Sequence, residues 1–253
     1  MLKVDIDTLF WNKTGINPLK KESELYHFHF AMEPKKINAL MGPTGIGKTT
    51  LFFLLAGLIH SSGSIQWEEK EINTLPPAKR PILLFFQEQN LFFHLNIKTN
   101  ILLNLDPKKN PGLMDALDDL FTKTNLTSVF NRFPDQLSGG QKQLVTLVRL
   151  LLRARFHSFP HFQHAIFLLD EPFNGLDEES QQMIQSLLKI EMEKLGFLLL
   201  YTSHDVALVR SFSEKVWAMQ RAKPVEVQKI EGLYGPLPSR KIITILPKEK
   251  NSL

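Results

Sequence analysis

The sequence predicts an α/β fold with a mostly parallel sheet, and two patterns carry this prediction. Short apolar runs recur along the chain, and the run at 165–169 is apolar throughout, as expected of a strand buried on both faces. Helix-like segments lie between these runs, the strongest at 142–152. The predicted parallel strands begin near Ile37, Ile82, Ile166, Phe197 and Val216.

A different strand pattern surrounds the first helix-like segment at 50–56. Apolar and polar residues alternate at 2–10 and 25–30, which predicts half-buried strands, and the segment 64–67 predicts another. After the strand near Ile82 the pattern changes again, because long strand-like runs are absent between about 87 and 132. Helices are expected there at 100–105 and 113–123, joined by a proline-containing polar loop at 107–112.

Length and composition limit the class of protein. With 253 residues and 43% hydrophobic content, the chain is long enough for one large α/β domain, and we expect residues 1–253 to form it. The longest nearly unbroken apolar stretch, 51–59, is too short to span a bilayer, and no export signal opens the chain. The absence of cysteine excludes disulfides and cysteine–zinc sites.

The positive charge is concentrated at one end of the chain. The segment from Glu214 onward contains eight basic and four acidic residues, so it accounts for the whole net charge of +4. The rest of the chain has no net charge, which argues against nucleic acid as the partner. We expect a short basic extension at about 220–253. A solvated tail is the favoured interpretation, and attraction of this segment to an anionic membrane is the alternative.

The segment 42–50 is a glycine-rich phosphate-binding motif. It fits G-x-x-x-x-G-K-[ST] and lies between a predicted strand and a predicted helix, which is the context this motif requires. We expect Lys48 to reach the β- and γ-phosphates of a nucleotide, and the Thr49 hydroxyl to ligate Mg²⁺. The expected nucleotide-binding residues are Gly42, Pro43, Thr44, Gly45, Ile46, Gly47, Lys48, Thr49 and Thr50.

Two acidic residues end the apolar strand at 165–169. Two carboxylates at the end of a buried strand are costly unless a cation lies close to them. Asp170 suits the coordination shell of Mg²⁺, and Glu171 suits a base that polarises the attacking water. The alternative is a strand that ends in a polar turn, helped by Pro172.

A second phosphate-type helix start lies at 137–141, where the sequence reads Leu-Ser-Gly-Gly-Gln ahead of the helical run at 142–152. Ser138 is a good N-cap, and the two glycines allow a phosphate to approach the exposed amides. With these residues in place, the chain resembles the ATP-binding-cassette (ABC) ATPases, whose signature is this pentapeptide. An ordinary capped helix is the alternative interpretation.

The resemblance implies a P-loop NTPase core, an antiparallel β subdomain and a helical subdomain at about 88–150 that ends at the signature. It further implies a head-to-tail homodimer in which Ser138, Gly139, Gly140 and Gln141 face the ATP of the partner subunit. Gln87 would contact Mg²⁺ and the attacking water, and His204 the γ-phosphate. Both residues follow predicted strands, where ligands bind in open α/β sheets.

Several positions depart from the pattern of the family. Asp177 matches the family's D-loop, whereas Asn174 and Gly175 replace its usual serine and alanine. Leu144 stands where an arginine is common. Trp11, or Phe10, is the candidate for stacking on adenine, with a place in the core as an equal alternative.

The resemblance also implies the partners. Four phenylalanines around Gln87, at 85, 86, 92 and 93, suggest the groove that grips a helix of a membrane permease, although each phenylalanine is equally compatible with the core.

The segments 74–81 and 86–92 resemble those of bacterial thiamine-import ATPases. We therefore expect an importer with a periplasmic solute-binding protein, the chain lying peripherally at the cytoplasmic face of the inner membrane. The alternatives are a soluble assembly ATPase of the iron–sulfur type, or a lipid or export system.

Three histidines cluster at 157, 161 and 164. No carboxylate or cysteine accompanies them in the sequence, and Pro160 breaks any helical face that would present them together. We therefore expect a surface loop here rather than a metal site.

Overall fold

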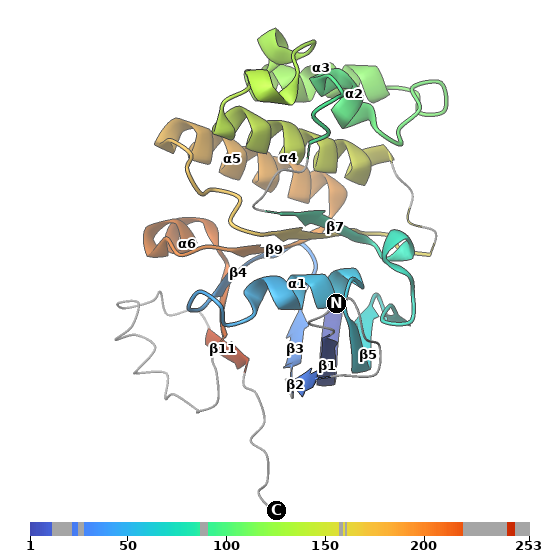
Figure 1. The fold of residues 1–253 in the computed structure, drawn as a ribbon, viewed down its shortest axis with the longest axis vertical. Coiled ribbons are helices and arrows are strands. Elements are labelled where there is room, and N and C mark those ends of the chain that lie inside the picture. Colours follow the sequence, from blue (N-terminus) through green and yellow to red (C-terminus); the bar gives the residue numbers. More distant parts are fainter. Residues whose placement is uncertain are drawn as a thin grey trace, which may run out of the picture.

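The computed structural model describes residues 1–11, 22–24, 28–86, 91–156, 159, 161–219 and 242–245. The described chain forms two sheets and a set of helices that lie in layers (Figure 1). Among its helices, none is long and apolar enough to cross a membrane.

The larger sheet has six described strands in the order β11-β10-β4-β9-β8-β7, and every neighbouring pair is parallel. This confirms the predicted parallel sheet. The order places β4 next to β9, and β9 next to β8, so segments far apart in the sequence end at one edge. The strands are β4 (Ile37–Met41), β7 (Ile82–Phe85), β8 (Ile166–Leu169), β9 (Leu198–Thr202), β10 (Lys215–Met219) and β11 (Ile242–Ile245).

The smaller sheet is antiparallel, with β1 at its centre pairing with β2, β3 and β5, as the alternating segments and the family resemblance led us to expect. β5 begins four residues before the predicted 64–67, and residues 25–27 of the predicted 25–30 strand lie outside the described residues. The strands are β1 (Leu2–Trp11), β2 (Glu22–Glu24), β3 (Phe28–Met32), β5 (His60–Trp67) and β6 (Lys70–Glu71).

The helices are α1 (Lys48–Ala56), α2 (Ile97–Leu102), α3 (Leu113–Lys123), α4 (Gly139–Phe156), α5 (Glu178–Leu195) and α6 (Val206–Phe212). The expected helices at 50–56 and 113–123 correspond closely to α1 and α3, whereas α4 extends beyond the expected 142–152 at both ends. α2 is shifted from the expected range of 100–105. It begins earlier because the Asn96 side chain accepts a hydrogen bond from the Thr99 N–H and caps it. It ends before Asn104, whose φ of 63° lies in the left-handed region.

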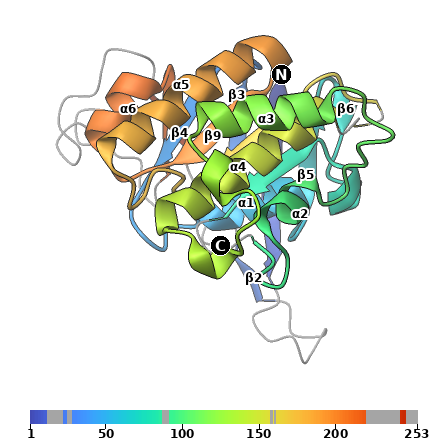
Figure 2. The ribbon, with the colours of Figure 1, turned by 90° about the horizontal axis from the view of Figure 1, so that it is seen from above.

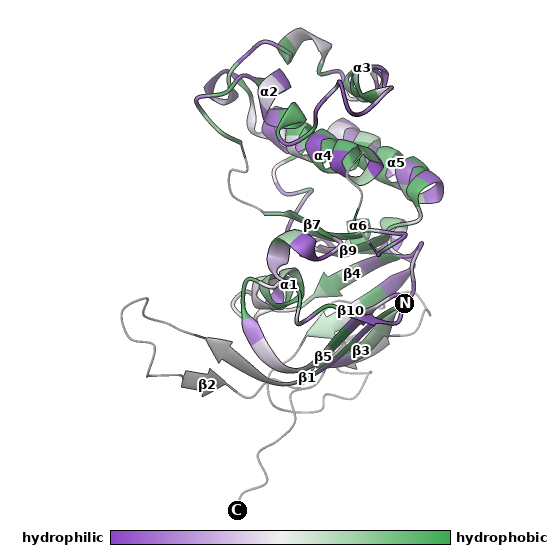
Figure 3. Ribbon diagram, turned by 90° about the vertical axis from the view of Figure 1, so that its right-hand side faces the viewer, coloured by the Kyte–Doolittle hydropathy of each residue, from purple (hydrophilic) through white to green (hydrophobic). Residues whose placement is uncertain are grey.

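Two hydrophobic cores lie on opposite faces of the parallel sheet. α1 packs between this sheet and the antiparallel sheet, and α4 and α5 cover the other face (Figures 1 and 3). Strand β8 contributes to both cores, since Phe167 and Leu169 face α4 while Ile166 and Leu168 face α1. Because both faces are covered, the strand is apolar throughout.

The helices α2 and α3 lie on the outer side of α4, away from the sheet (Figures 1 and 2). They form the helical part that the resemblance implied between about 88 and 150. Leu113, Leu117, Leu120 and Phe121 of α3 are buried in the same core as the inner face of α4. The exact domain limits remain a prediction.

A buried arginine, Arg80, holds the far end of α1 next to Gly57. The Arg80 guanidinium donates to the carbonyl oxygens of Leu54 (2.9 Å) and Leu55 (2.6 Å) at the last turn of the helix. A cation here complements the negative end of the helix dipole. A Cβ at Gly57 would lie 2.6 Å from the Arg80 Nε, so only glycine admits this guanidinium. The position of α1, and of the loop before it, is thereby fixed.

Candidate functional site

The phosphate-binding motif forms the loop between β4 and α1. α1 begins at Lys48, directly after Gly47, which has a φ of 108° and therefore favours glycine. At Gly42 a Cβ would lie 2.8 Å from the Met219 carbonyl oxygen, so the loop can pass the end of β10 only as glycine. The loop therefore presents the N-terminus of α1, and its unpaired N–H groups, at the carboxyl edge of the sheet.

Lys48 lies folded over this loop. Its Nζ donates to the carbonyl oxygens of Gly42 (2.7 Å) and Pro43 (3.2 Å), and the side chain is largely buried. Burial lowers the pKa of Lys48, while the nearby carboxylates of Glu171 and Asp170 act against that shift. The ammonium group is thus desolvated and bonded only to neutral acceptors, which phosphate oxygens can replace with stronger charge-assisted bonds.

Asp170 is held by two threonine hydroxyls. Thr49 donates to its Oδ2 (2.8 Å) and Thr202 donates to its Oδ1 (2.7 Å). The fold therefore brings together two of the three residues predicted to hold Mg²⁺, Thr49 from α1 and Asp170 from the end of β8. Hydroxyl and carboxylate oxygens are the ligands that this hard cation prefers, so the residues present fit it.

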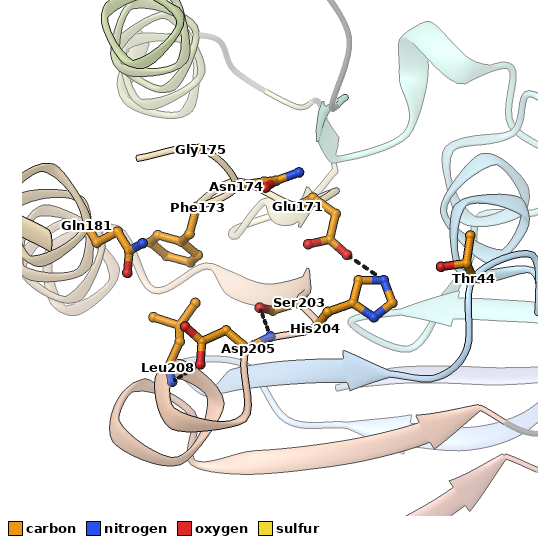
Figure 4. A pocket seen from close by; sticks show the side chains of 10 residues that line it. All are labelled: Thr44, Glu171, Phe173, Asn174, Gly175, Gln181, Ser203, His204, Asp205 and Leu208. Carbon is orange, nitrogen blue, oxygen red and sulfur yellow. Dashed lines mark hydrogen bonds and ion pairs between the residues drawn. The ribbon is translucent and has the colours of Figure 1, made fainter. Parts of the chain in front are cut away.

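Glu171 is the next residue, and its backbone is strained. It has a φ of 50°, and its N–H donates to the Thr202 hydroxyl (2.8 Å). Its Oε1 lies 3.2 Å from His204 Nε2 (Figure 4). Burial raises the pKa of the Glu171 carboxyl, while His204 and Lys48 act to lower it. A raised pKa suits a general base, and positive φ in a non-glycine residue is concentrated at functional sites.

A cavity of about 600 Å³ opens beside this pair of residues (Figure 4). Its size is typical of small-molecule sites. It is bordered by residues from the phosphate-binding loop, from the segment after β8 and from the segment after β9. The lining consists of Thr44, Glu171, Phe173, Asn174, Gly175, Gln181, Ser203, His204, Asp205 and Leu208.

The signature begins α4 with a reciprocal cap. The Gln141 N–H donates to Ser138 Oγ (3.2 Å), and the Ser138 N–H donates to Gln141 Oε1 (3.1 Å). This arrangement is a capping box, and it confirms Ser138 as the N-cap. Four of the five signature residues, Ser138 to Gln141, line a second cavity of about 520 Å³, together with Gly175 and Asp177. None of the four lines the cavity beside Glu171.

The segment between Glu171 and α5 separates the two cavities, and Gly175 lines both. Gly175 has a φ of 74°, in a region that alanine adopts only with strain. This geometry accounts for glycine at position 175, where alanine is usual. Asp177 caps α5 by accepting from the Ser180 N–H (2.8 Å), and this bond lowers the pKa of its carboxyl.

Two predicted site residues are not placed with the others. Gln87 lies outside the described residues. Trp11 is the last residue of β1, where its backbone pairs with Glu22, and its side chain is also outside the description. Both assignments therefore remain predictions.

Thr202 is the main residue that the sequence analysis missed. Its hydroxyl connects Asp170 with the backbone of Glu171, and the side chain is completely buried. The only available signal was its place, a hydroxyl residue at the carboxyl end of the strand that precedes His204.

The histidine cluster also needs a correction. A carboxylate does accompany it, because the fold brings Glu68 Oε1 to within 2.8 Å of His164 Nδ1. Glu68 follows β5, far from the cluster in sequence, so sequence spacing did not reveal it. Within the described part of the chain, no group of three potential metal ligands is found.

This fold, with a phosphate-binding loop, an acidic strand end and a separate signature helix, defines an ATP-binding-cassette ATPase. The family model described as ABC transporter matches residues 25–174, more than half of the chain, and the chain therefore belongs to the ABC transporter family. It is the ATPase subunit of an ABC transporter, and it hydrolyses ATP.

Its relatives include thiamine import ATP-binding proteins, ThiQ. The protein from Vibrio vulnificus (strain YJ016) is 36% identical over 193 residues, which cover 75% of this chain and 79% of that protein. The protein from Vibrio parahaemolyticus serotype O3:K6 (strain RIMD 2210633) is 32% identical over 222 residues, covering 87% and 91%. The protein from Escherichia coli (strain K12) is 36% identical over 190 residues, covering 72% and 78%.

Solved structures show the same fold. The dimeric post-hydrolysis state of the ATP-binding cassette MJ0796, bound to ADP and Pi, matches with a TM-score of 0.67 at 23% identity, covering 87% of this chain and 94% of that chain. An ATP-binding subunit of an ABC transporter matches with a TM-score of 0.70 at 20% identity, covering 93% and 95%.

Proposed function

We propose that this chain is the ATP-hydrolysing subunit of a bacterial small-nutrient importer of the thiamine type, acting as a head-to-tail homodimer on Mg²⁺-ATP. The observation that carries the catalytic part is the group Thr49, Asp170, Thr202, Glu171 and His204, gathered beside the phosphate-binding loop. The likeness to thiamine import ATP-binding proteins supports the class of solute.

In this proposal the residues of the loop bind the phosphates of ATP. Lys48 exchanges the Gly42 and Pro43 carbonyl oxygens for phosphate oxygens, and the N–H groups at the start of α1 supply further donors. Thr49 and Asp170 hold Mg²⁺, with Gln87 as a further ligand. When bound, Mg²⁺ neutralises charge on the β- and γ-phosphate oxygens.

Glu171 acts as the base toward the attacking water in this proposal. Burial keeps its carboxylate poorly solvated, and Thr202 fixes its backbone. His204 lies beside the same carboxylate and reaches the γ-phosphate from the end of β9. Both groups approach the cavity from neighbouring strands, so the water is held between protein and phosphate.

The signature acts on the nucleotide of the partner subunit. Ser138, Gly139, Gly140 and Gln141 border a cavity of their own and not the cavity beside Glu171, which favours a site completed by a second copy of the chain. Asp177 lies at that signature cavity and contributes to the same interface.

The permease would dock near the exposed phenylalanines after β7. Phe92 and Phe93 are 45% and 50% exposed, whereas Phe85 is buried and the Phe86 ring packs at a tilt against the Phe53 ring, with 5.5 Å between the ring centroids. Phe85 thus belongs to the interior, Phe86 is partly buried against Phe53, and Phe92 and Phe93 remain for an apolar partner helix. This partner, with a periplasmic solute-binding protein, would hold the chain peripherally at the cytoplasmic face of the inner membrane.

The catalytic roles are tested with Glu171→Gln. The amide cannot accept a proton, so ATP binding should persist while turnover falls by at least about a hundredfold, and the dimer should be trapped with ATP. Nucleotide binding, ATPase rate and size-exclusion chromatography measure these effects. Full turnover by verified E171Q protein would contradict the assignment.

The shared site is tested by mixing subunits. Lys48→Ala should weaken ATP binding, and Ser138→Arg should block the signature, so each variant alone should be inactive. A mixed dimer retains one intact pair of loop and signature, and its ATPase activity should reappear in the mixture. Wild-type rates from either variant alone would exclude the shared site.

Copurification and uptake separate this function from its alternatives. We expect the tagged chain to copurify with a polytopic permease. Deletion of the gene that encodes this chain should abolish the uptake of labelled thiamine. A soluble assembly scaffold in place of the permease would favour the assembly ATPase. Unchanged thiamine uptake in cells lacking other thiamine importers would exclude that solute and leave the ATPase intact.

A further inference from the structure

The segment that joins the candidate base to α5 lies against the start of the signature helix of the same chain. This segment, residues 171–177, is called the connecting turn below. Gln143 of α4 donates a hydrogen bond from Nε2 to the Asn174 carbonyl oxygen (2.9 Å). A Cβ on Gly140 would lie 3.0 Å from Leu176 Cδ2. The helix and the turn therefore touch at two points.

Asn174 is held through both of its main-chain groups. Its N–H donates to the Glu171 carbonyl oxygen (3.2 Å), and its own carbonyl accepts from Gln143. At the other end of the turn, the Glu171 N–H is held by the Thr202 hydroxyl (2.8 Å). A short series of hydrogen bonds thus leads from the signature helix to the backbone of the candidate base.

The orientation of the Gln143 amide depends on this contact. Its Oε1 is buried and has no hydrogen-bond partner among the residues the structure describes. A flipped amide would place that oxygen against the Asn174 carbonyl oxygen, which is repulsive, so the donor contact assigns the orientation. A buried oxygen without a hydrogen-bond partner costs free energy, and the hydrogen bond from Nε2 to the turn offsets part of that cost.

We propose that Gln143 is a positioning residue that makes the signature helix and the connecting turn move together. This inference rests on the proposed function, in which Glu171 serves one ATP and the signature of the same chain serves the other. The turn is the wall between the two cavities, because Gly175 lines both. A shift of the signature on meeting the partner's ATP therefore displaces Asn174 and, through it, Glu171.

Small displacements at this place matter for the reaction. Glu171 must hold a water in line with the phosphate, and a misplacement of about 1 Å in such a geometry costs on the order of a hundredfold in rate. Gln143 does not line the cavity beside Glu171 and thus acts only through the turn. Its loss should therefore affect turnover more than nucleotide binding.

The first test measures the mobility of the turn without nucleotide. The chain contains no cysteine, so Asn174→Cys provides a unique site for a nitroxide label. Asn174 is exposed, and its bond to Gln143 uses the backbone carbonyl, so the label leaves that bond intact. Adding Gln143→Ala should increase the mobility of the label in the electron paramagnetic resonance spectrum. Unchanged mobility would overturn the proposal.

A matched control comes from α5. Gln182 is also a glutamine that donates from Nε2, here to Glu178 (3.2 Å) on the exposed face of the helix. Gln182→Ala should leave both label mobility and ATPase rate as they are in the parent protein. An equal increase in mobility with Q182A would show a general loosening and would also overturn the proposal.

The second test uses unlabelled protein and steady-state kinetics. For Gln143→Ala, kcat should fall about fivefold, the equivalent of one neutral hydrogen bond, while KM for ATP stays within about twofold. For Gln143→Glu, kcat should fall further, because a carboxylate then faces the Asn174 carbonyl oxygen. For Gln143→Lys, much of the parent kcat should be recovered, because the ammonium group can donate a hydrogen bond to that oxygen. A Q143K rate no higher than that of Q143A would contradict the role of the donor.

The two levels of proposal fail separately. Full turnover by E171Q would remove the catalytic assignment, whatever the label shows. The mobility measurement requires neither ATP nor a dimer, so an immobile label in Q143A would remove the positioning role while the catalytic assignment stands.

Discussion

At the scale of single residues, the Thr202 hydroxyl organises the candidate site. It donates to Asp170 Oδ1 (2.7 Å) and accepts from the Glu171 N–H (2.8 Å). One buried hydroxyl thus orients the carboxylate proposed to hold Mg²⁺ and the backbone of the proposed base. Its two partners are adjacent residues with different roles, so their relative position depends on it.

Thr202→Val should therefore impair both stability and turnover. The valine keeps the shape of the side chain but leaves the Glu171 N–H without its partner, which should lower the free energy of unfolding by about 1–3 kcal/mol. We expect kcat to fall at least about tenfold, because Glu171 loses its anchor. Urea denaturation and ATPase assays measure these effects, and Thr202→Ser, which keeps the hydroxyl, should behave nearly as the parent.

The raised pKa of Glu171 predicts a pH-dependent difference between the parent protein and E171Q. Because the carboxyl pKa is raised on folding, protonated Glu171 contributes stability that is complete below the ordinary value of 4.5 and is lost as pH rises through the folded-state pKa. Above the folded-state pKa the parent carries a partly buried carboxylate that the variant lacks. E171Q should gain stability over the parent as pH rises from about 5 to 8, measured by urea denaturation without nucleotide. A difference that is constant over this range would contradict the burial argument.

At the scale of elements, α4 and α5 are joined by a buried ion pair at the end away from the signature. Arg155 donates to both carboxylate oxygens of Glu191 (2.8 and 2.6 Å), and Glu191 is completely buried. Lys194 also lies 3.5 Å from Glu191 but is 54% exposed. The pair therefore joins the two helices at this end, whereas Gln143, near the start of α4, contacts the turn that precedes α5.

Arg155→Met should be strongly destabilising, because it leaves the buried Glu191 carboxylate without its bidentate partner. We expect a loss of about 3 kcal/mol in the free energy of unfolding, with the double variant R155M/E191M recovering much of that loss. Lys123→Met, which removes the exposed pair with Asp119, is the matched control and should change stability by less than about 1 kcal/mol. Equal effects of R155M and K123M would show that the buried pair is unimportant.

At the scale of the whole molecule, the order of the parallel strands brings the site together. Strands β4, β9 and β8 are neighbours, so the phosphate-binding loop, His204 and the Asp170–Glu171 pair meet at one edge. The signature is carried by the helical layer on one face of the sheet (Figure 3). The two halves of the proposed ATP site are consequently on different surfaces of one subunit.

The exposed phenylalanines provide a prediction for the assembled transporter. Phe92→Ser together with Phe93→Ser should reduce copurification of the permease and lower solute uptake by about tenfold, because two apolar anchors are lost. The ATPase rate of the isolated subunit should stay unchanged. Leu58→Ser removes another strongly exposed apolar side chain (55%), which follows the end of α1, and it should leave uptake intact. Equal losses with L58S would argue against a specific docking surface.

Local patterns in the sequence were sufficient for much of the fold and for the core of the site. Lys48 and Thr49 belong to a motif whose loop and helix are made by consecutive residues, so spacing alone predicted their place beside a phosphate. The strands at Ile37, Ile166 and Phe197 were predicted because burial on both faces leaves an apolar run. The capping box of Ser138 and Gln141 is equally local.

The contacts that depend on packing between distant segments appeared only in the folded chain. Thr202 lies 32 residues from Asp170, Glu68 lies 96 from His164, and Gln143 lies 31 from Asn174. The sequence pattern around a hydroxyl, a carboxylate or an amide does not indicate its hydrogen-bond partner. The partner depends on which strands and helices pack next to each other in the folded chain. Residue types and spacing therefore predicted the chemistry of this protein, whereas the three-dimensional arrangement established which side chains hold that chemistry in place.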